Sequence, residues 1–192
     1  KKAQSIDRII CSTDHPDIAS ICRQSSVEVI NRPKELSGDL VRSDDVMIHA
    51  AKNLMLTDGN VAEVLVLLQP TSIFLKGNQI DEAVNALFED PTANSSQTVV
   101  KVPHQFHAIN QRKLFGDGKD IGFVYLKERE QSFNKQTKPV YYGFGNLIAM
   151  RTKALVQKKS MYARPSIPIY IPLTNSYDLD SWDDIELAEL MI

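Results

Sequence analysis

Apolar and polar positions follow two alternating periods along the first half of the chain. Short apolar runs typical of strands occupy residues 7–12, 26–30, 61–68 and 98–102, and helically spaced apolar residues fill 43–56 and 77–88 between them. A short strand at 145–150, a helix from Thr152, a strand at 167–171 and a helix at 181–191 follow. Because strands that alternate with helices form covered parallel sheets, this pattern predicts an α/β fold. We expect three layers, with a mostly parallel, twisted sheet and helices on both faces.

Residues 103–142 interrupt this rhythm with a turn-forming Gly116-Asp117-Gly118, mixed charge and five aromatic residues, Phe106, Phe115, Phe123, Tyr125 and Phe133. We interpret the region as an excursion from the sheet, in the form of a β-rich arm on a single domain spanning residues 1–192. Exposed aromatic side chains on an arm indicate a subunit interface. An irregular lid packed on its own domain is the alternative.

The apolar run at 64–68 ends abruptly in Gln69-Pro70-Thr71-Ser72. Such a run is typical of a strand that is buried on both faces, and ligands of open α/β sheets bind at the carboxyl ends of strands. Asp178 and Asp180 follow the apolar run at 167–173 in the same way. The sequence therefore predicts that Gln69 and the two aspartates line one active-site crevice.

Asp178 and Asp180 are the best candidates for a metal site. Residues i and i+2 of an extended segment point to the same side, and Mg²⁺ prefers a few carboxylates together with phosphate oxygens and water. The alternative is that both acids, with Asp183 and Asp184, only stabilise the N-terminus of the helix that Ser181 begins.

Four other side chains are candidates for ligand contacts, each with a structural alternative. Arg32 leaves a strand end and can bind phosphate or a base carbonyl, whereas Ser43 can contact a base edge or cap a helix. Gln69 can recognise hydroxyl or carboxyl groups, or hold a neighbouring loop. Gln136 lies near Lys135 and Lys138, in a turn that could simply be a solvated basic segment.

The composition of the chain argues against several classes of protein. The 192 residues are 43% hydrophobic and 24% charged with a net charge of −2, and no basic stripe indicates nucleic-acid binding. No apolar stretch approaches the roughly 20 residues that cross a bilayer. Cys11 and Cys22 lack metal-ligand spacing, which favours reduced thiols and a cytoplasmic protein. We interpret His104 and His107 as loop histidines.

Four stretches, taken in order, resemble the cytidylyltransferases that activate sialic acids and related nonulosonic acids. They are Ile10-Cys11-Ser12-Thr13-Asp14, Arg32-Pro33-x-x-Leu36-x-x-Asp39-x-x-x-Ser43, Leu68-Gln69-Pro70-Thr71-Ser72, and Asp178-x-Asp180 with Asp184. The resemblance covers almost the whole chain and implies a nucleotide-diphospho-sugar transferase fold. It also implies that Arg32 and Ser43 contact the nucleotide of CTP, that Gln69 and Gln136 contact the sugar acid, and that Asp178 and Asp180 bind Mg²⁺. The excursion would be the arm of a homodimer.

The chain also departs from this family. The opening strand and Ala-Arg-x-Gly-Ser-Lys type loop have no counterpart here, so we expect an N-terminally incomplete domain that lacks its main phosphate contacts. Ile73-Phe74-Leu75 replaces Pro-Leu-Arg, Asn134-Lys135-Gln136 replaces Arg-Arg-Gln, and Phe144-Gly145-Asn146 replaces Asn-Gly-Ala. Another sugar nucleotidyltransferase and a catalytically silent, dimerising relic of the family are therefore the alternatives.

Overall fold

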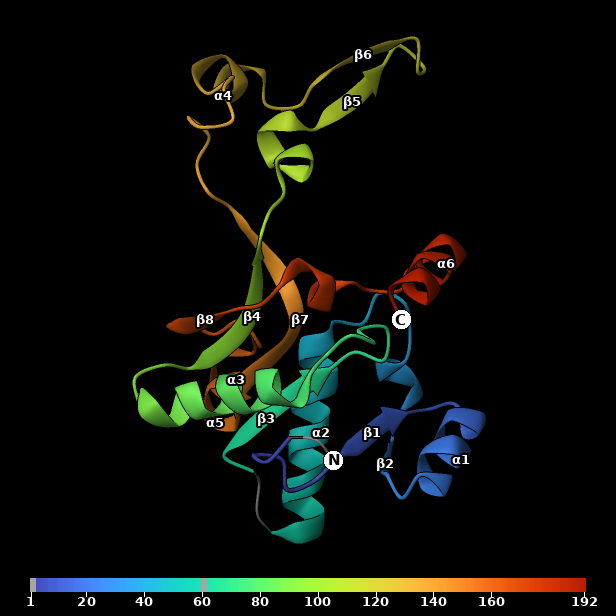
Figure 1. The fold of residues 1–192 in the computed structure, drawn as a ribbon. Coiled ribbons are helices and arrows are strands. Elements are labelled where there is room, and N and C mark those ends of the chain that lie inside the picture. Colours follow the sequence, from blue (N-terminus) through green and yellow to red (C-terminus); the bar gives the residue numbers. More distant parts are fainter. Residues whose placement is uncertain (1–2, 60–61) are drawn as a thin grey trace.

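The computed structural model describes residues 3–59 and 62–192, and it confirms a mixed α/β architecture (Figure 1). The main sheet has the strand order β3 (Val64–Leu68), β7 (Tyr142–Arg151), β4 (Ser95–Lys101) and β8 (Ser166–Tyr170). A separate parallel pair joins β1 (Ile10–Thr13) to β2 (Glu28–Asn31). The longer helices are α1 (Pro16–Gln24), α2 (Ser43–Asp58), α3 (Gly77–Glu89), α5 (Thr152–Lys158) and α6 (Trp182–Met191). Four 3₁₀ turns complete the chain, at Lys34–Leu36, His104–Phe106, Ala108–Asn110 and Leu173–Ser176.

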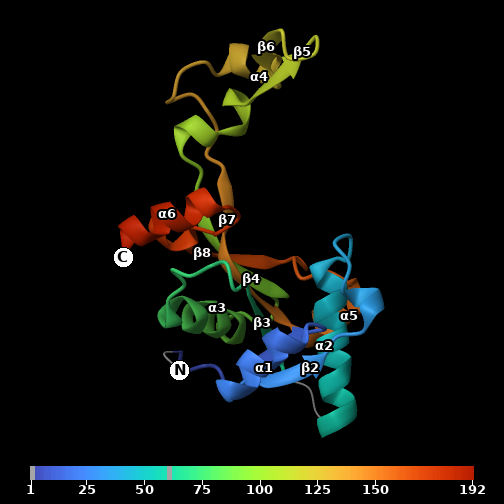
Figure 2. The ribbon, with the colours of Figure 1, turned by 90° about the vertical axis from the view of Figure 1, so that its right-hand side faces the viewer.

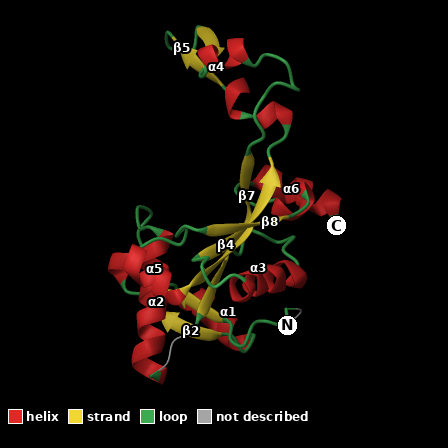
Figure 3. Ribbon diagram, turned by 90° about the vertical axis from the view of Figure 1, so that its left-hand side faces the viewer, coloured by secondary structure: helices red, strands yellow, loops and turns green. Residues whose placement is uncertain are grey.

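Helices cover both faces of the main sheet, as predicted. Alternate residues of β7 point to opposite sides: Leu147 and Ala149 pack against α3, whereas Ile148 and Met150 pack with Leu155 of α5 and with α2. All four β7 side chains are fully buried. Figure 3 shows α3 on one side of the sheet and α2 and α5 on the other. A period-2 strand between two helical layers explains the three-layer core.

β3, which the sequence predicted to be buried on both faces, is an edge strand of the main sheet. Val64 and Val66 pack towards α3, and Leu65 and Leu67 pack towards α2, so both faces of the strand are covered. Its other edge pairs with no strand in the described part of the chain, and these four residues are only half-buried. A continuous apolar run therefore indicates that both faces of a strand are covered. It does not indicate whether the strand lies at the edge or in the interior of the sheet.

β7 runs antiparallel to both of its neighbours, whereas β4 and β8 are parallel. The chain leaves the sheet at the end of β4 and returns at the same end, since Lys101 pairs with Tyr142. A strand that re-enters in this way must run in the opposite direction, so β4 and β7 form a hairpin with a very long connection. We call this connection, residues 102–141, the arm.

The arm projects away from the sheet, as Figures 1 and 2 show from two directions. It carries the hairpin of β5 (Arg112–Phe115) and β6 (Asp120–Phe123), followed by the short helix α4 (Leu126–Gln131). The region leaves the sheet as an excursion, but its two short strands are accompanied by a helix and two 3₁₀ turns, so it is not predominantly β. Among the described residues, no helix has the length and apolarity that a bilayer crossing requires.

Candidate active site

Two segments that are far apart in sequence meet beyond the carboxyl end of β3. The Ser72 hydroxyl donates a hydrogen bond to Asp178 Oδ1 at 3.3 Å, and the Leu179 backbone N–H donates to the Thr71 carbonyl at 3.2 Å. Ser72 is buried and Asp178 is half-buried. The proximity that the sequence predicted for the segments at 69–72 and 178–180 is therefore observed.

A buried amide network holds these two segments in place. The Gln79 side chain at the start of α3 donates to Asn175 Oδ1 at 3.2 Å, and Asn146 Nδ2 of β7 donates to Gln79 Oε1 at 3.0 Å and to the Asn175 carbonyl at 2.7 Å. Asn175 in turn donates to the Phe74 carbonyl at 3.3 Å. The network ties the loop after β3 to the segment before Asp178, and buried, fully bonded amides of this kind rigidify their surroundings.

The sequence analysis did not identify these amides as structural residues. Asn146 and Phe74 fall at positions where the chain departs from the family pattern, and Phe74 also packs edge-on against Tyr177, with ring centroids 6.3 Å apart. The position of Asn146 within an apolar strand could have indicated the network, because a buried amide needs hydrogen-bond partners.

Asp184 differs from Asp178 and Asp180 in its contacts. Asp184 caps α6: its carboxylate accepts the Ser181 hydroxyl and backbone N–H, both at 2.8 Å, and the Tyr177 hydroxyl at 3.1 Å. The Ser181 hydrogen bond is the main reason that the pKa of Asp184 lies below its usual value. The helix-stabilising alternative therefore holds for Asp184, whereas the side chains of Asp178 and Asp180 take no part in this cap.

Asp178 and Asp180 lie in different surroundings. Asp178 faces Ser72, whereas Asp180 is exposed and lines a shallow pocket of about 240 Å³ with Trp182 and Ile185. No group of three or more potential metal ligands occurs among the described residues. Two carboxylates nevertheless suit Mg²⁺, which completes its octahedron with water and substrate phosphates.

Arg32 lies where β1 and β2 end together. Its backbone N–H donates to the Thr13 carbonyl at 3.0 Å, and its guanidinium lies 3.6 Å from Asp14 Oδ1. Its Nε atom is buried without a hydrogen-bond partner among the described residues, as is the Ser12 hydroxyl. Two polar groups at this strand end are thus buried and unpaired among the described residues, and the sequence analysis had not singled out Ser12.

The expectation that Ser43 could be a helix cap is wrong. The N-cap position of α2 belongs to Arg42, and Ser43 is an exposed first helical residue. The neighbouring Asp44 anchors this end of the helix instead, because it accepts the Met161 backbone N–H at 2.7 Å and the Arg42 guanidinium at 2.6 Å. Helix boundaries inferred from sequence are uncertain by a residue or two.

The two predicted glutamines lie in separate places. Gln69 is exposed, and its amide makes no hydrogen bond within the described residues, so it does not hold a neighbouring loop. Gln136 lines a pocket of about 420 Å³ where the arm joins the sheet, and none of the other five predicted site residues lines that pocket. Within one chain, Thr71 and Ser72, which follow Gln69, contact the segment at 178–179, whereas Gln136 lies elsewhere.

Several solved structures share this fold. The chain is similar to a CMP:2-keto-3-deoxy-manno-octonic acid synthetase complexed with CTP (11% identity, TM-score 0.63, 99% of this chain and 82% of the other). It also resembles 4-diphosphocytidyl-2C-methyl-D-erythritol synthase from Anaerococcus prevotii (12% identity, TM-score 0.63, 100% of this chain and 82% of the other). A third similar structure is 2-C-methyl-D-erythritol 4-phosphate cytidylyltransferase from Thermus thermophilus. It is 10% identical with a TM-score of 0.60, and the match covers 98% of this chain and 83% of the other. At these identities the likeness establishes the fold.

The sequence itself establishes the family. The family model described as cytidylyltransferase matches residues 1–169, which is most of the 192-residue chain. Together with the nucleotide-diphospho-sugar transferase architecture, this match shows that the chain belongs to the cytidylyltransferase family of enzymes.

Proposed function

We propose that this protein transfers CMP from CTP to the anomeric hydroxyl of a sialic acid-like nonulosonic acid and releases pyrophosphate. The contact that supports the proposal is the Ser72–Asp178 hydrogen bond, because it joins the segment that begins with Gln69 to the segment that carries the aspartate pair. The motifs around these residues are the ones that resemble the enzymes acting on nonulosonic acids. Family membership supplies the reaction class.

In this proposal the predicted residues have three tasks: nucleotide binding, sugar-acid binding and metal binding. Arg32, whose buried Nε lacks a partner among the described residues, and the exposed hydroxyl of Ser43 contact the base or ribose of CTP. Gln69 orients the sugar acid through its amide, which can both donate and accept. Asp178 and Asp180 bind Mg²⁺, which neutralises charge on the CTP phosphates when it is bound. Nucleotidyl transfer requires in-line placement more than covalent help from the protein, so positioning by the amide network suits it.

The proposed enzyme is a homodimer. Gln136 lies on the arm, apart from Gln69 of the same chain. In the homodimer, Gln136 of one subunit would contact the sugar acid that is bound at Gln69 of the other subunit. The arm also exposes apolar side chains that need a partner surface, including Leu114 (65% exposed), Ile121 (61%) and Phe133 (67%).

The substrate class can be tested by measuring pyrophosphate release with CTP and Mg²⁺ in the presence of different acceptors. We expect release with one or more of sialic, legionaminic and pseudaminic acids, and none with 2-C-methyl-D-erythritol 4-phosphate. Release with 2-keto-3-deoxy-manno-octonic acid alone would favour the alternative, a nucleotidyltransferase for another sugar acid. No release with any acceptor, although the protein is folded, would favour the silent relic.

The Gln69→Ala variant tests the site within the same assay. Loss of a hydrogen bond to a substrate hydroxyl or carboxylate should raise the KM for the acceptor about tenfold and leave the KM for CTP unchanged. Gln97→Ala is the matched control, because this glutamine on β4 bonds only Ser166. Equal effects of the two substitutions would contradict the assignment of Gln69.

A further inference from the structure

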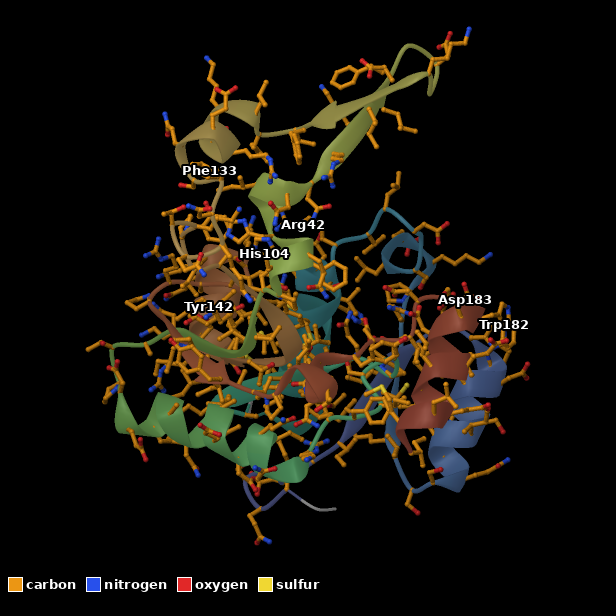
Figure 4. The ribbon with its side chains drawn as sticks, turned by 45° about the horizontal axis from the view of Figure 1, so that its top comes forward. Arg42, His104, Phe133, Tyr142, Trp182 and Asp183 are labelled. Atoms are coloured by element: carbon orange, nitrogen blue, oxygen red, sulfur yellow. The ribbon has the colours of Figure 1, made fainter. Side chains whose placement is uncertain are left out.

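The two cysteines of the chain, Cys11 and Cys22, lie on elements that pack against each other. Cys11 is the second residue of β1, and Cys22 lies in the last turn of α1. Both residues are half-buried, and both thiols are free. Figures 1 and 2 show α1 beside the β1–β2 pair, and Figure 4 shows α1 (blue) on the side of the molecule that carries Trp182, away from His104 at the base of the arm. The two cysteines are therefore remote from the arm.

Backbone contacts hold the end of α1 against the β1–β2 pair. Cys11 is the partner of Val29 in the register of the two strands, so the side chains of these residues point to the same face. Val27, two residues before Val29, donates its backbone N–H to the Cys22 carbonyl at 2.8 Å. On α1, the buried Ala19 lies three residues before Cys22 and hence on the same side of the helix. The packed side of α1 therefore carries Cys22 towards the strands.

The thiols of Cys11 and Cys22 face each other and interact as hydrogen-bond partners. The pKa of the Cys11 thiol lies above its usual value, first because of desolvation, and then because of the hydrogen bond with Cys22 and the repulsion between negative charges on the two sulfurs. The Arg32 guanidinium acts in the opposite direction, since a nearby cation favours the thiolate. Two thiols in direct contact meet the main requirement for a disulfide, which is that the sulfurs can approach without a large movement of the backbone.

We propose that Cys11 and Cys22 are a modification site, at which exchange with a small disulfide such as oxidised glutathione forms a reversible disulfide within the chain. In the first exchange, the thiolate of one cysteine attacks oxidised glutathione, which gives a mixed disulfide and releases one glutathione. In the second, the other cysteine attacks the protein sulfur of the mixed disulfide and releases another glutathione. One S–S bond of glutathione is broken and one S–S bond of the protein is formed. The two cysteine sulfurs are oxidised, the two glutathione sulfurs are reduced, and the two thiol protons pass to the released glutathione.

The position of the two cysteines places this modification beside Arg32. Arg32 follows β2 directly, and its guanidinium is close enough to Cys11 to affect the titration of the thiol. The disulfide removes the thiol next to this cation and fixes the last turn of α1 to the strand that ends at Thr13. Under reducing conditions the same two residues remain thiols, so the link between α1 and β1 responds to the redox state of the surroundings.

The disulfide can be tested by equilibrating the folded protein with mixtures of reduced and oxidised glutathione, followed by acid quenching and mass spectrometry. We expect a species that has lost two hydrogen atoms and carries no glutathione. The matched control is the same chain in urea, where the fold no longer holds Cys11 and Cys22 together. The equilibrium constant for closing the disulfide should be at least about tenfold larger in the folded chain, because a disulfide that fits the fold is favoured by the same factor by which it stabilises the fold.

Cys11→Ser and Cys22→Ser provide a second comparison, because each leaves a single thiol that can hold glutathione only as a mixed disulfide. A glutathione adduct should accumulate in both variants and not in the wild type. The inference is overturned if the wild type accumulates the adduct or does not react, if its closing constant is no larger than in urea, or if its disulfide joins two chains. These wild-type results decide the matter even where a variant does not fold. Because CTP and acceptor are absent, failure of the proposed transferase reaction changes none of these readings.

Discussion

At the scale of single residues, the candidate site depends on which carboxylates are already engaged. Asp184 is committed to the start of α6, whereas Asp180 presents its side chain to solvent without a hydrogen bond in the described residues. Sequence spacing had identified Asp178 and Asp180 as a pair, but it could not separate them from the capping acids nearby. The separation comes from three-dimensional contacts, namely those of Ser72 with Asp178 and of Ser181 with Asp184.

Asp180→Asn should lower turnover at limiting Mg²⁺ by roughly 10- to 100-fold, because a neutral amide binds the ion less well than a carboxylate. Raising Mg²⁺ should recover part of the loss, which distinguishes weaker metal binding from a structural defect. Pyrophosphate release measured against Mg²⁺ concentration checks this. Asp183→Asn is the control, since it removes the same charge from an exposed position in the first turn of α6 and should leave the Mg²⁺ dependence unchanged. Identical curves for both variants would contradict the metal role of Asp180.

At the scale of elements, much of the order and type of the helices and strands could be predicted from the sequence. The periodicity placed α2 and α3 to within a few residues, and the capping Ser181 with the acids that follow it placed the start of α6. It could not show that β7 runs antiparallel, since strand direction depends on where the arm returns to the sheet. It also could not place β3 at the edge, because a strand with two covered faces has the same apolar sequence at the edge as in the interior.

Gly145→Ala should destabilise the junction of β7 and β4. A Cβ at this position would lie 2.7 Å from Thr98 Cβ and 2.9 Å from Ile171 Cδ1, next to the register shift between Gln97 and Val99. Overpacking of this kind costs about 1–3 kcal/mol, and Tm falls by roughly 2–4 °C per kcal/mol in a protein of this size. Thermal unfolding of Gly143→Ala on the same strand provides the control, because its nearest neighbours are 3.9 Å away. A Tm that falls as far for Gly143→Ala as for Gly145→Ala would disprove this account.

The start of α6 should loosen in acid. Because the folded-state pKa of Asp184 is lowered, its stabilising contribution is complete above the usual carboxyl pKa and is lost as pH falls through the lowered value. The protection factors of the Asp180 and Ser181 amides, whose N–H groups donate to Asp184, should therefore fall below the usual carboxyl pKa. Ser181→Ala removes the main cause of the shift, so the same loss of protection should begin at a higher pH. An unchanged midpoint in this variant would show that the hydroxyl does not control the titration.

At the scale of the whole molecule, charge and apolar surface are unevenly distributed. Of the 22 lysines and arginines and 24 acids in the chain, the arm contains seven and four, so the arm is basic while the remainder is acidic. The β5–β6 hairpin has all eight of its strand residues exposed or only half-buried, and isolated two-stranded hairpins are at best marginally stable in water. Contacts of the Arg112 and Arg129 guanidinium groups with the Phe123 ring, at 4.5 and 4.0 Å, stabilise the arm only locally. In the proposed homodimer, a second molecule covers this apolar surface.

Light scattering should show a dimer that depends on the arm. Replacing residues 104–139 by a short glycine turn keeps the β4–β7 pairing and should give a folded monomer. Leu114→Ser/Ile121→Ser should weaken the dimer at least tenfold, because these side chains are 65% and 61% exposed in the single chain and each buried leucine or isoleucine contributes about 1.5–3 kcal/mol. Trp182→Ser is the control, since this residue is 82% exposed but lies on α6, outside the arm. A dimer that survives loss of the arm would contradict an arm interface and leave Gln136 without a route to the partner's site, and one that dissociates only in Trp182→Ser would locate the interface on the C-terminal helix.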